Sequence, residues 1–355
     1  MKRHPRHYSI CYEIIQNYKS DIPFPLYLQN ISRINKSWGS KDRQSYRELS
    51  YLYLKNIEFF QGLTNEAKFV KTWQQLEEGT LAYSEAYSRF ESHISETINI
   101  QQLNAWYHKR GPVFVHALDI DKLKNTLLWN EAEPTDYKNV KCFPANSPIQ
   151  SWVDNGWAYI QDISSFKVIS ENIESFVDKR VWDTCSGAGG KALSISRIAQ
   201  PKEVICTDIR QNILENLKRR FENSPYDTPI HFTFDIEKDS LSDGLKKSDV
   251  IFADVPCSGS GTWRRSPEQL NAFSIGLLND YTSRQAKILN RLLGIKLTNT
   301  CIYCTCSIFK EENENLVRNA LSENDEYVLE KESYVGTDHH TEGDYLYYAV
   351  LKRPL

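Results

Sequence analysis

The sequence predicts an α/β protein whose C-terminal half is a doubly wound, mostly parallel sheet. From residue 180 onward, short apolar runs alternate with helical segments, which is typical of the strands and helices of such a sheet. Acidic residues close the first four apolar runs, at the edge where sheets of this kind bind ligands. The chain of 355 residues is long enough for two or three domains. The upstream segments predict a helical domain followed by a small α+β module.

The first 95 residues predict the helical domain. Residues 5–90 keep helical spacing with few breaking residues, and Pro23 and Pro25 interrupt the spacing once. Ser40 is expected to be an N-cap, because apolar side chains recur at helical intervals after it. Residues 1–60 carry ten Lys and Arg against five Asp and Glu. This local charge of +5 fits phosphate binding and a plain solvated surface equally well.

Residues 96–150 have a different pattern, which predicts the small α+β module. A strand is expected at 113–115, a helix at 119–128 and a second strand at 140–143.

Residues 151–355 predict the doubly wound domain. The expected strands are 180–184, 203–207, 230–234, 249–253, 299–304, 327–331 and 345–351. The expected helices are 189–199, 211–221 and 277–293.

The composition excludes several classes of protein. No stretch is apolar enough to span a membrane, and the basic N-terminus lacks the apolar core of a secretory signal, so the expected location is the cytoplasm. Eight cysteines are too few for a disulfide scaffold. Cys301 and Cys304 form a Cys-x-x-Cys on an expected strand, where residues three apart face opposite sides. We therefore expect no metal site.

The first expected strand runs into a glycine-rich turn, Asp183-Thr-Cys-Ser-Gly-Ala-Gly-Gly-Lys191. Its spacing fits neither Gly-x-Gly-x-x-Gly nor a P-loop, so a pyrophosphate is not the expected ligand. Asp208, Asp235 and Asp254 close the next three strands. A rim of carboxylates beside a glycine turn suits a ligand with ribose, amino and ammonium groups. S-adenosylmethionine has these groups and is the expected cofactor.

Two Cys-Ser pairs follow the fourth and fifth strands, at Cys257 and Cys306. Carbon 5 of cytosine is a poor nucleophile, but a thiolate that adds to carbon 6 makes carbon 5 electron-rich enough to accept a methyl group. Such covalent catalysis needs an activated thiol beside the methyl donor. Both cysteines meet this requirement, since each lies in a polar turn at the predicted rim.

These motifs resemble those of the RNA cytosine-5 methyltransferases of the RsmB/Fmu/Sun family, and the resemblance covers residues 150–355. The matching segments are Asp183, Cys185, Gly189–Lys191, Asp254-Val-Pro-Cys-Ser-Gly-Ser-Gly261, Arg264-Arg265-Ser-Pro-Glu268, Thr305-Cys306-Ser307 and Glu312-Asn313-Glu314. The resemblance implies a Rossmann-like class I methyltransferase domain. It also implies that the helical domain is NusB-like and that residues 96–150 are an RRM-like module, where His116-Ala117-Leu118 replaces the usual Arg-x-Asn.

The resemblance also implies a role for each site residue. Cys306 would attack carbon 6, Cys257 would help to release the product, Asp254 would bind the ring edge, and Lys191 would orient the nucleotide. The implied cofactor residues are Asp183, Cys185, Gly187, Gly189, Gly190, Lys191, Asp208, Ile209, Asp235 and Asp254. Arg264 and Arg265 could reach phosphates or form a solvated pair.

The expected partner is RNA, with ribosomal RNA preferred over transfer RNA, and the expected state is a monomer. A DNA cytosine-5 methyltransferase would need a Glu-Asn-Val segment, which the sequence lacks. An adenine amino-methylating enzyme would need an aromatic residue where Cys257 stands. A non-catalytic RNA-binding or ribosome-assembly factor with a methyltransferase fold is the remaining alternative.

Overall fold

The computed structural model describes residues 3–19, 22–336 and 342–354. The chain divides into two compact units. The helical unit comprises Met1–Ser92, Ile98–Arg110 and Trp263–Ser274. The α/β unit comprises His93–Thr97, Gly111–Thr262 and Ile275–Leu355. Among the described residues, no helix is both long and apolar enough to cross a membrane.

The helical unit packs around aromatic and aliphatic side chains. Its helices are α1 (Pro5–Asn17), α2 (Phe24–Ile34), α3 (Ser40–Lys55), α4 (Glu66–Glu77), α5 (Ile100–His108) and α13 (Pro267–Ala272), with 3₁₀ turns at Ile57–Phe60 and Ser88–His93. Trp73 and Leu49 are fully buried in its core, and the Trp73 indole donates a 3.0 Å hydrogen bond to the Leu49 carbonyl. The N-cap of α3 is Gly39 and not Ser40, because the Asp42 carboxylate accepts a hydrogen bond from the Gly39 N–H.

A four-stranded antiparallel sheet with the order β2-β3-β1-β4 forms the first part of the α/β unit. Its strands are β1 (Val113–Ala117), β2 (Glu133–Pro134), β3 (Val140–Phe143) and β4 (Ala158–Ile160). The expected helix at 119–128 is instead two short helices, α6 (Ile120–Leu123) and α7 (Leu127–Glu131). The reason is that Asp119 and Thr126 each accept hydrogen bonds from the backbone that follows, so each starts a helix of its own. A third short helix is α8 (Gln150–Asp154).

His116 anchors this small sheet to the rest of the α/β unit. Its imidazole is fully buried and stacks on the Tyr159 ring at 4.8 Å. Nε2 donates to the Gln161 carbonyl at 3.1 Å, and Nδ1 accepts from Arg197 at 3.3 Å. Burial, followed by the Arg197 charge, lowers the pKa of His116 to about 3. His116, at which the resemblance led us to expect an arginine, is therefore a neutral core side chain.

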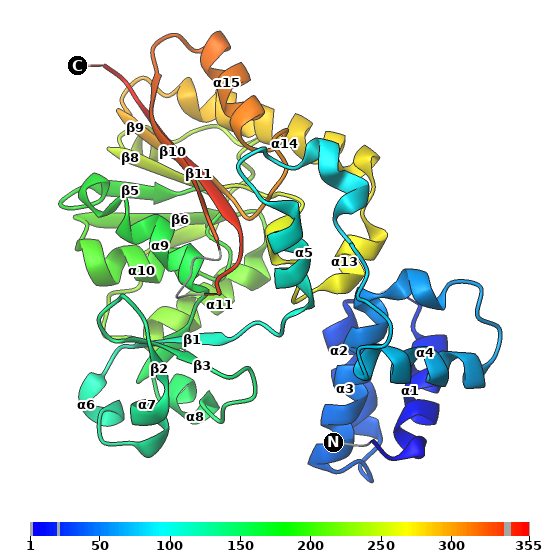
Figure 1. Ribbon diagram of the computed structural model, residues 1–355. Helices are drawn as coiled ribbons and strands as arrows, with labels where there is room; N and C mark the ends of the chain where they lie inside the picture. Colours follow the sequence, from blue (N-terminus) through cyan, green and yellow to red (C-terminus); the bar gives the residue numbers. More distant parts are fainter. Residues whose placement is uncertain (1–2, 20–21, 337–341, 355) are drawn as a thin grey trace. The chain divides into compact units, whose positions relative to one another are not determined.

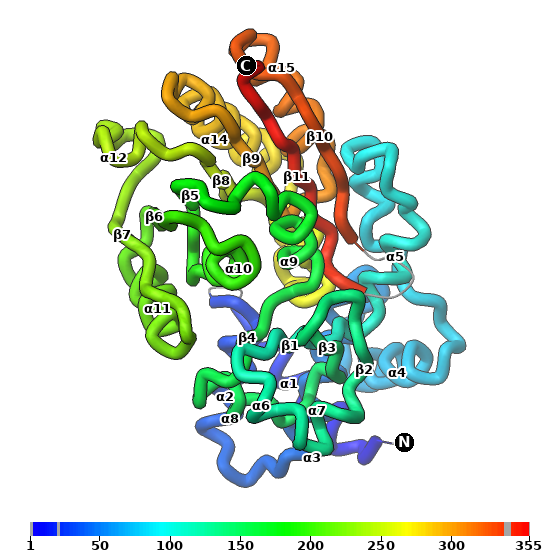
Figure 2. The backbone as a smooth tube through the Cα atoms, turned by 90° about the vertical axis from the view of Figure 1, so that its left-hand side faces the viewer, coloured from blue at the N-terminus to red at the C-terminus, as the bar shows by residue number. Residues whose placement is uncertain are grey.

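The second sheet has seven strands in the order β10-β11-β9-β8-β5-β6-β7 (Figure 2). The strands are β5 (Arg180–Asp183), β6 (Glu203–Asp208), β7 (Ile230–Thr233), β8 (Val250–Asp254), β9 (Thr300–Thr305), β10 (Val328–Val335) and β11 (Leu346–Lys352). The five strands from β7 to β9 are parallel, whereas β11 is antiparallel to β9. The predicted doubly wound architecture is confirmed.

Helices cover both faces of this sheet (Figure 1). One face packs against α9 (Ile163–Ser170), α10 (Gly190–Ala199) and α11 (Gln211–Glu222), next to a 3₁₀ turn at Ile173–Ser175. The other packs against α12 (Asp243–Lys246), α14 (Ile275–Leu293) and α15 (Glu314–Glu323). Cys301 and Cys304 of β9 lie in the cores of opposite faces, as the strand periodicity predicts. Chain order reverses on either side of β5, and such a switch point opens a crevice at the carboxyl ends of the strands.

Candidate active site

A cavity of about 700 Å³ lies at the carboxyl ends of β5, β6, β7, β8 and β9. This volume is in the range of small-molecule sites. Most of the predicted site residues line it: Cys185, Gly187, Gly190, Lys191, Asp208, Ile209, Asp235, Asp254, Cys257 and Cys306. Asp183 and Gly189 do not.

The glycine turn shapes the wall of the cavity after β5. Gly187 has φ +53°, and a Cβ built on it would meet no atom within 4 Å. Its N–H donates a 3.0 Å hydrogen bond to Asp208 Oδ2. Gly189 serves packing instead, because a Cβ there would lie 2.6 Å from Cγ of Leu217 on α11. The turn therefore leaves open space above Gly187 while Gly189 lets α10 and α11 approach each other.

Asp208 ends β6 and is 4 % exposed. Oδ1 accepts from the backbone N–H and Nε of Arg210 at 2.9 and 3.0 Å, and Oδ2 accepts from Arg210 Nη2 at 3.0 Å. Burial raises the pKa of Asp208, but the hydrogen bonds and charge of Arg210 outweigh it, so the pKa lies below its ordinary value. The side chain of Arg210 is 59 % exposed.

Lys191 and Asp254 form an ion pair on the wall of the cavity. Lys191 Nζ lies 2.7 Å from Asp254 Oδ2. Burial lowers the pKa of Lys191, but the Asp254 carboxylate and the neighbouring thiols raise it by more. The pKa therefore lies above its ordinary value. Behind the pair, Asp183 is only 1 % exposed, and burial together with the Asp254 charge raises its pKa well above the ordinary range. Within the described residues its Oδ1 has no hydrogen-bond partner.

The two predicted cysteines meet at the cavity, with their sulfur atoms 3.2 Å apart. The hydrogen bond to Cys306, followed by burial, raises the pKa of Cys257 well above its ordinary value. The two thiols are thus within hydrogen-bond distance of each other, and this contact favours the protonated form of Cys257.

The serines that follow the two cysteines converge on Glu312. The Ser258 N–H donates to Oε1 at 2.8 Å and the Ser258 hydroxyl to Oε2 at 2.5 Å, while the Ser307 hydroxyl also donates to Oε2. Gln285 Nε2 adds a bond to Oε1 at 2.9 Å. Glu312 is fully buried, and burial raises its pKa. The Glu312 side chain therefore links the loop that carries Cys257 to the loop that carries Cys306.

The family model described as 16S rRNA methyltransferase RsmB/F matches residues 173–351, which is half of the chain.

The chain belongs to this family.

Curated relatives are similar to about half of the chain. Ribosomal RNA small subunit methyltransferase B of Cronobacter sakazakii is 28 % identical over 209 residues, which cover 56 % of this chain and 47 % of that protein. The protein of the same name from Photorhabdus laumondii is 28 % identical over 45 % of this chain and 37 % of its own length. The 5-cytosine rRNA methyltransferase nsun-4 of Caenorhabditis elegans is 30 % identical over 41 % of this chain and 33 % of its own. The matches thus span less than half of each of these relatives.

Solved structures share the fold of this RsmB/F family member. PH0851 superposes with a TM-score of 0.75 over 99 % of this chain and 100 % of its own, at 15 % identity. A methyltransferase homolog from Pyrococcus horikoshii gives a TM-score of 0.54 over 72 % of this chain and 90 % of its own, at 17 % identity.

Several functional candidates of this family member were outside the sequence prediction. Glu312 belongs to a quoted motif but had no predicted role; the repeated Cys-Ser pairs were the signal that both loops share an acceptor. Arg220 of α11 lines the cavity, and burial lowers its pKa. Nothing in the sequence distinguishes it from a surface arginine of an amphipathic helix. Arg264 does not reach the surface as expected: it is 3 % exposed, with its guanidinium 4.7 Å from the Trp106 ring within the helical unit, whereas Arg265 is exposed.

Among the described residues, no cluster of His, Cys, Asp and Glu could hold a metal ion.

Proposed function

We propose that this protein methylates carbon 5 of a cytosine in RNA, with ribosomal RNA as the first candidate and S-adenosylmethionine as the methyl donor. The observation that carries the proposal is the pair of thiols 3.2 Å apart beside the Lys191–Asp254 ion pair in one cavity. Membership of the RsmB/F family supports the same chemistry.

The cavity fits the methyl donor. Open space above Gly187 admits a ligand close to the backbone. Ile209, Phe234 and Ile236 provide apolar walls between the carboxylates of Asp208 and Asp235, which can accept hydrogen bonds from hydroxyl and amino groups. Arg210 currently occupies the acceptors of Asp208, and its exposed side chain gives them up when ribose hydroxyls replace it. Bound here, S-adenosylmethionine supplies an activated methyl group next to the thiols.

Cys306 is assigned as the nucleophile, because it occupies the Thr305-Cys306-Ser307 motif and lines the cavity 3.2 Å from Cys257. Its thiolate forms a bond to carbon 6 of cytosine, which makes carbon 5 nucleophilic. Asp254, held by Lys191, accepts a hydrogen bond from the amino edge of the ring. Carbon 5 would then take the methyl group of bound S-adenosylmethionine, whose sulfur–methyl bond breaks to leave S-adenosylhomocysteine.

Cys257 acts in product release. Its high pKa depends first on the hydrogen bond to Cys306. Once Cys306 is a neutral thioether this cause disappears, so Cys257 loses its proton more readily and can serve as the base. It removes the carbon 5 proton, the carbon 5–carbon 6 double bond forms again, and the sulfur–carbon 6 bond breaks.

The two cysteine variants test this assignment. With RNA from a strain that lacks the gene, Cys306→Ala should transfer no methyl group and form no adduct. Cys257→Ala should turn over poorly and accumulate an RNA–protein adduct that survives a denaturing gel. Both should still bind S-adenosylmethionine by calorimetry, since the thiols form a small part of the cavity.

Two outcomes contradict the proposal. An adduct in Cys306→Ala but not in Cys257→Ala would reverse the roles. No methyl transfer and no adduct with any form, wild type included, would favour a non-catalytic assembly factor. Bisulfite sequencing of total RNA with and without the gene identifies the modified cytosine.

The domain assignments at 1–95, 96–150 and 151–355, the NusB-like and RRM-like characters, the monomeric state and the cytoplasmic location stay predictions.

A further inference from the structure

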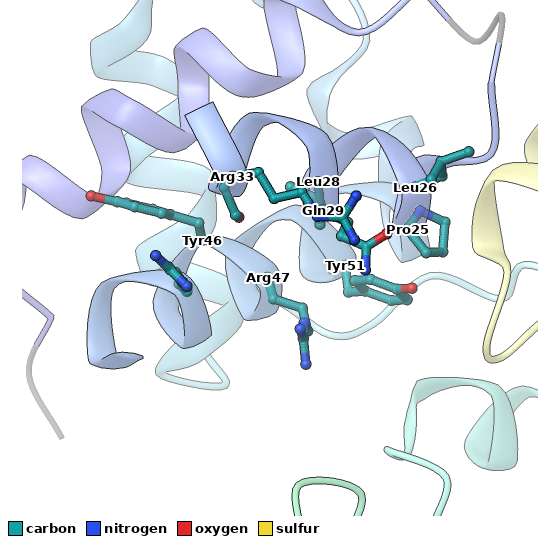
Figure 3. A pocket seen from close by; sticks show the side chains of 10 residues that line it. Pro25, Leu26, Leu28, Gln29, Arg33, Tyr46, Arg47 and Tyr51 are labelled. Atoms are coloured by element: carbon teal, nitrogen blue, oxygen red, sulfur yellow. The ribbon is translucent and has the colours of Figure 1, made fainter. Parts of the chain in front are cut away.

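A second cavity, of about 710 Å³, lies between α2 and α3 of the helical unit. We call it the arginine groove. Its lining residues are Pro25, Leu26, Leu28, Gln29, Ser32, Arg33, Arg43, Tyr46, Arg47 and Tyr51. Figure 3 shows Leu28 and Gln29 on α2, Tyr46 on the adjacent α3, and the Arg47 guanidinium extended away from its helix.

The groove carries three positive charges and no negative one. Arg33, Arg43 and Arg47 are exposed, and none of the ten lining residues is acidic. Within the described part of the chain, these three arginines form no ion pair. Like charges gathered without counter-charges repel one another and attract an anion.

The acidic residues of α3 are engaged elsewhere. Asp42 binds His7 at 3.0 Å and the Gly39 N–H at 2.9 Å. Glu48 binds Arg3 at 2.7 Å and lies 3.7 Å from Arg110. Both carboxylates of the helix are therefore engaged by groups outside the groove.

The spacing of the arginines suits an extended polyanion. Arg43 and Arg47 are four residues apart, so they lie on one face of α3 about 6 Å apart along its axis. Tyr51 continues the same face, and Arg33 lies across the groove on α2. Leu28 and Tyr46 are buried beneath them, which gives the groove an apolar floor. Charged walls over an apolar and aromatic floor are typical of sites for single-stranded nucleic acid.

We propose that the arginine groove binds the phosphate backbone of RNA through Arg33, Arg43 and Arg47. The choice of RNA as the polyanion rests on the proposed function. All three arginines belong to residues 1–60, whose local charge of +5 fits phosphate binding and a solvated surface equally well. Their place in one groove favours phosphate binding.

The test compares two full-length variants with equal charge change. The groove variant is Arg33→Gln/Arg43→Gln/Arg47→Gln. The control is Arg6→Gln/Lys36→Gln/Lys41→Gln, whose targets are exposed residues of the helical unit outside the groove. The probe is a labelled oligouridine, which has no cytosine, so its binding does not depend on methyl transfer. Fluorescence anisotropy at several salt concentrations gives the affinity and its salt dependence.

The groove variant should bind at least tenfold more weakly at low salt. Its salt slope should fall by about 2, since each single-strand phosphate contact contributes ~0.7. The control should keep most of the wild-type slope, and both variants should keep the wild-type Tm because exposed side chains are replaced.

Equal affinity and slope in the groove and control variants would overturn the proposal. Polyaspartate serves as a second probe, for an acidic protein partner. A groove variant that keeps oligouridine binding but loses polyaspartate binding would also overturn the proposal. Intact oligouridine binding with no methyl transfer would count against the proposed function alone.

Discussion

Replacement of Glu312 is the most direct test of how this fold positions its thiols. Glu312→Ala removes an acceptor that four donors share: the Ser258 N–H, the Ser258 and Ser307 hydroxyls, and the Gln285 amide. Glu312→Gln is the matched control. Its carbonyl oxygen can take the place of Oε1 toward the two N–H donors, and its amide can donate to the two serine hydroxyls, which rotate and can accept.

The two variants should differ strongly in stability. A buried donor left without a partner costs about 1–3 kcal/mol, and Glu312→Ala leaves four neutral donors without their shared acceptor. We expect Glu312→Ala to lower the free energy of unfolding by about 3 kcal/mol, the upper end of this range. Glu312→Gln should lower it by about 1 kcal/mol, because it exchanges charged for neutral hydrogen bonds.

The electrostatic effect separates positioning from plain stability. The Glu312 charge contributes to the raised pKa of Cys257, after the hydrogen bond to Cys306 and burial. Glu312→Gln should therefore lower the pKa of Cys257 in a folded protein. Urea unfolding gives the stability, and mass spectrometry of Cys257 alkylation against pH gives the thiol titration. An alanine variant within about 1 kcal/mol of wild type, together with an unchanged Cys257 titration in the glutamine variant, would refute the reasoning.

Three further predictions follow from the described contacts. Asp208→Ala should weaken S-adenosylmethionine binding at least tenfold by calorimetry. Arg210→Ala should strengthen it, because the carboxylate then loses its competing side-chain donors and keeps only the backbone N–H groups of residues 187 and 210. Unchanged affinity in both variants would remove Asp208 from the pocket. Arg220→Met should weaken the binding of an anionic group in the cavity. Weaker binding of S-adenosylmethionine would indicate that Arg220 binds its carboxylate, and weaker binding of oligouridine would indicate a phosphate. Unchanged affinity for both would contradict an anion-binding role for Arg220. Burial, then the Arg264 charge, lowers the pKa of Lys55 to about 7. The unfolded chain therefore binds more protons, so stability should rise between about pH 7 and about pH 9 by up to ~2 kcal/mol, and a Lys55→Met protein measured in parallel should lack this rise.

The large sheet could be predicted because its signal is local. Buried parallel strands read as apolar runs, and acidic or small residues end them. The antiparallel placement of β11 beside β9 carries no such signal, since it depends on pairing between residues 42 to 52 positions apart. The same holds for α13, which follows the Cys257 loop in the sequence but packs within the helical unit. The two caps that split the expected helix at 119–128 were readable, because Asp119 and Thr126 are favoured N-cap residues.

The site could be predicted to the level of its residues but not of its pairings. The rim carboxylates and both thiols come from strand ends, and parallel strands bring these ends to one edge. The bidentate Arg210–Asp208 pair could not be predicted, because a side chain two residues downstream could equally point to solvent. Arg264 shows the opposite error: a charged pair in a loop indicates a surface, whereas packing on Trp106 buries one member.

The repeated Cys-Ser pairs have a structural reason that connects them to the proposed chemistry. The strand ladder holds the backbones of the two loops together: the Val255 N–H donates to the Cys304 carbonyl at 3.1 Å, and the Gly261 N–H donates to the Cys306 carbonyl at 2.9 Å. Glu312 ties the serines behind the thiols. The proposed nucleophile and the proposed base are thus held together at one end of two neighbouring strands, where both can reach one cytosine ring. A misplacement of about 1 Å in such a pair can cost about a hundredfold in rate. The two serines and the buried glutamate therefore fix the distance between the sulfur atoms more than they set the reactivity of either thiol.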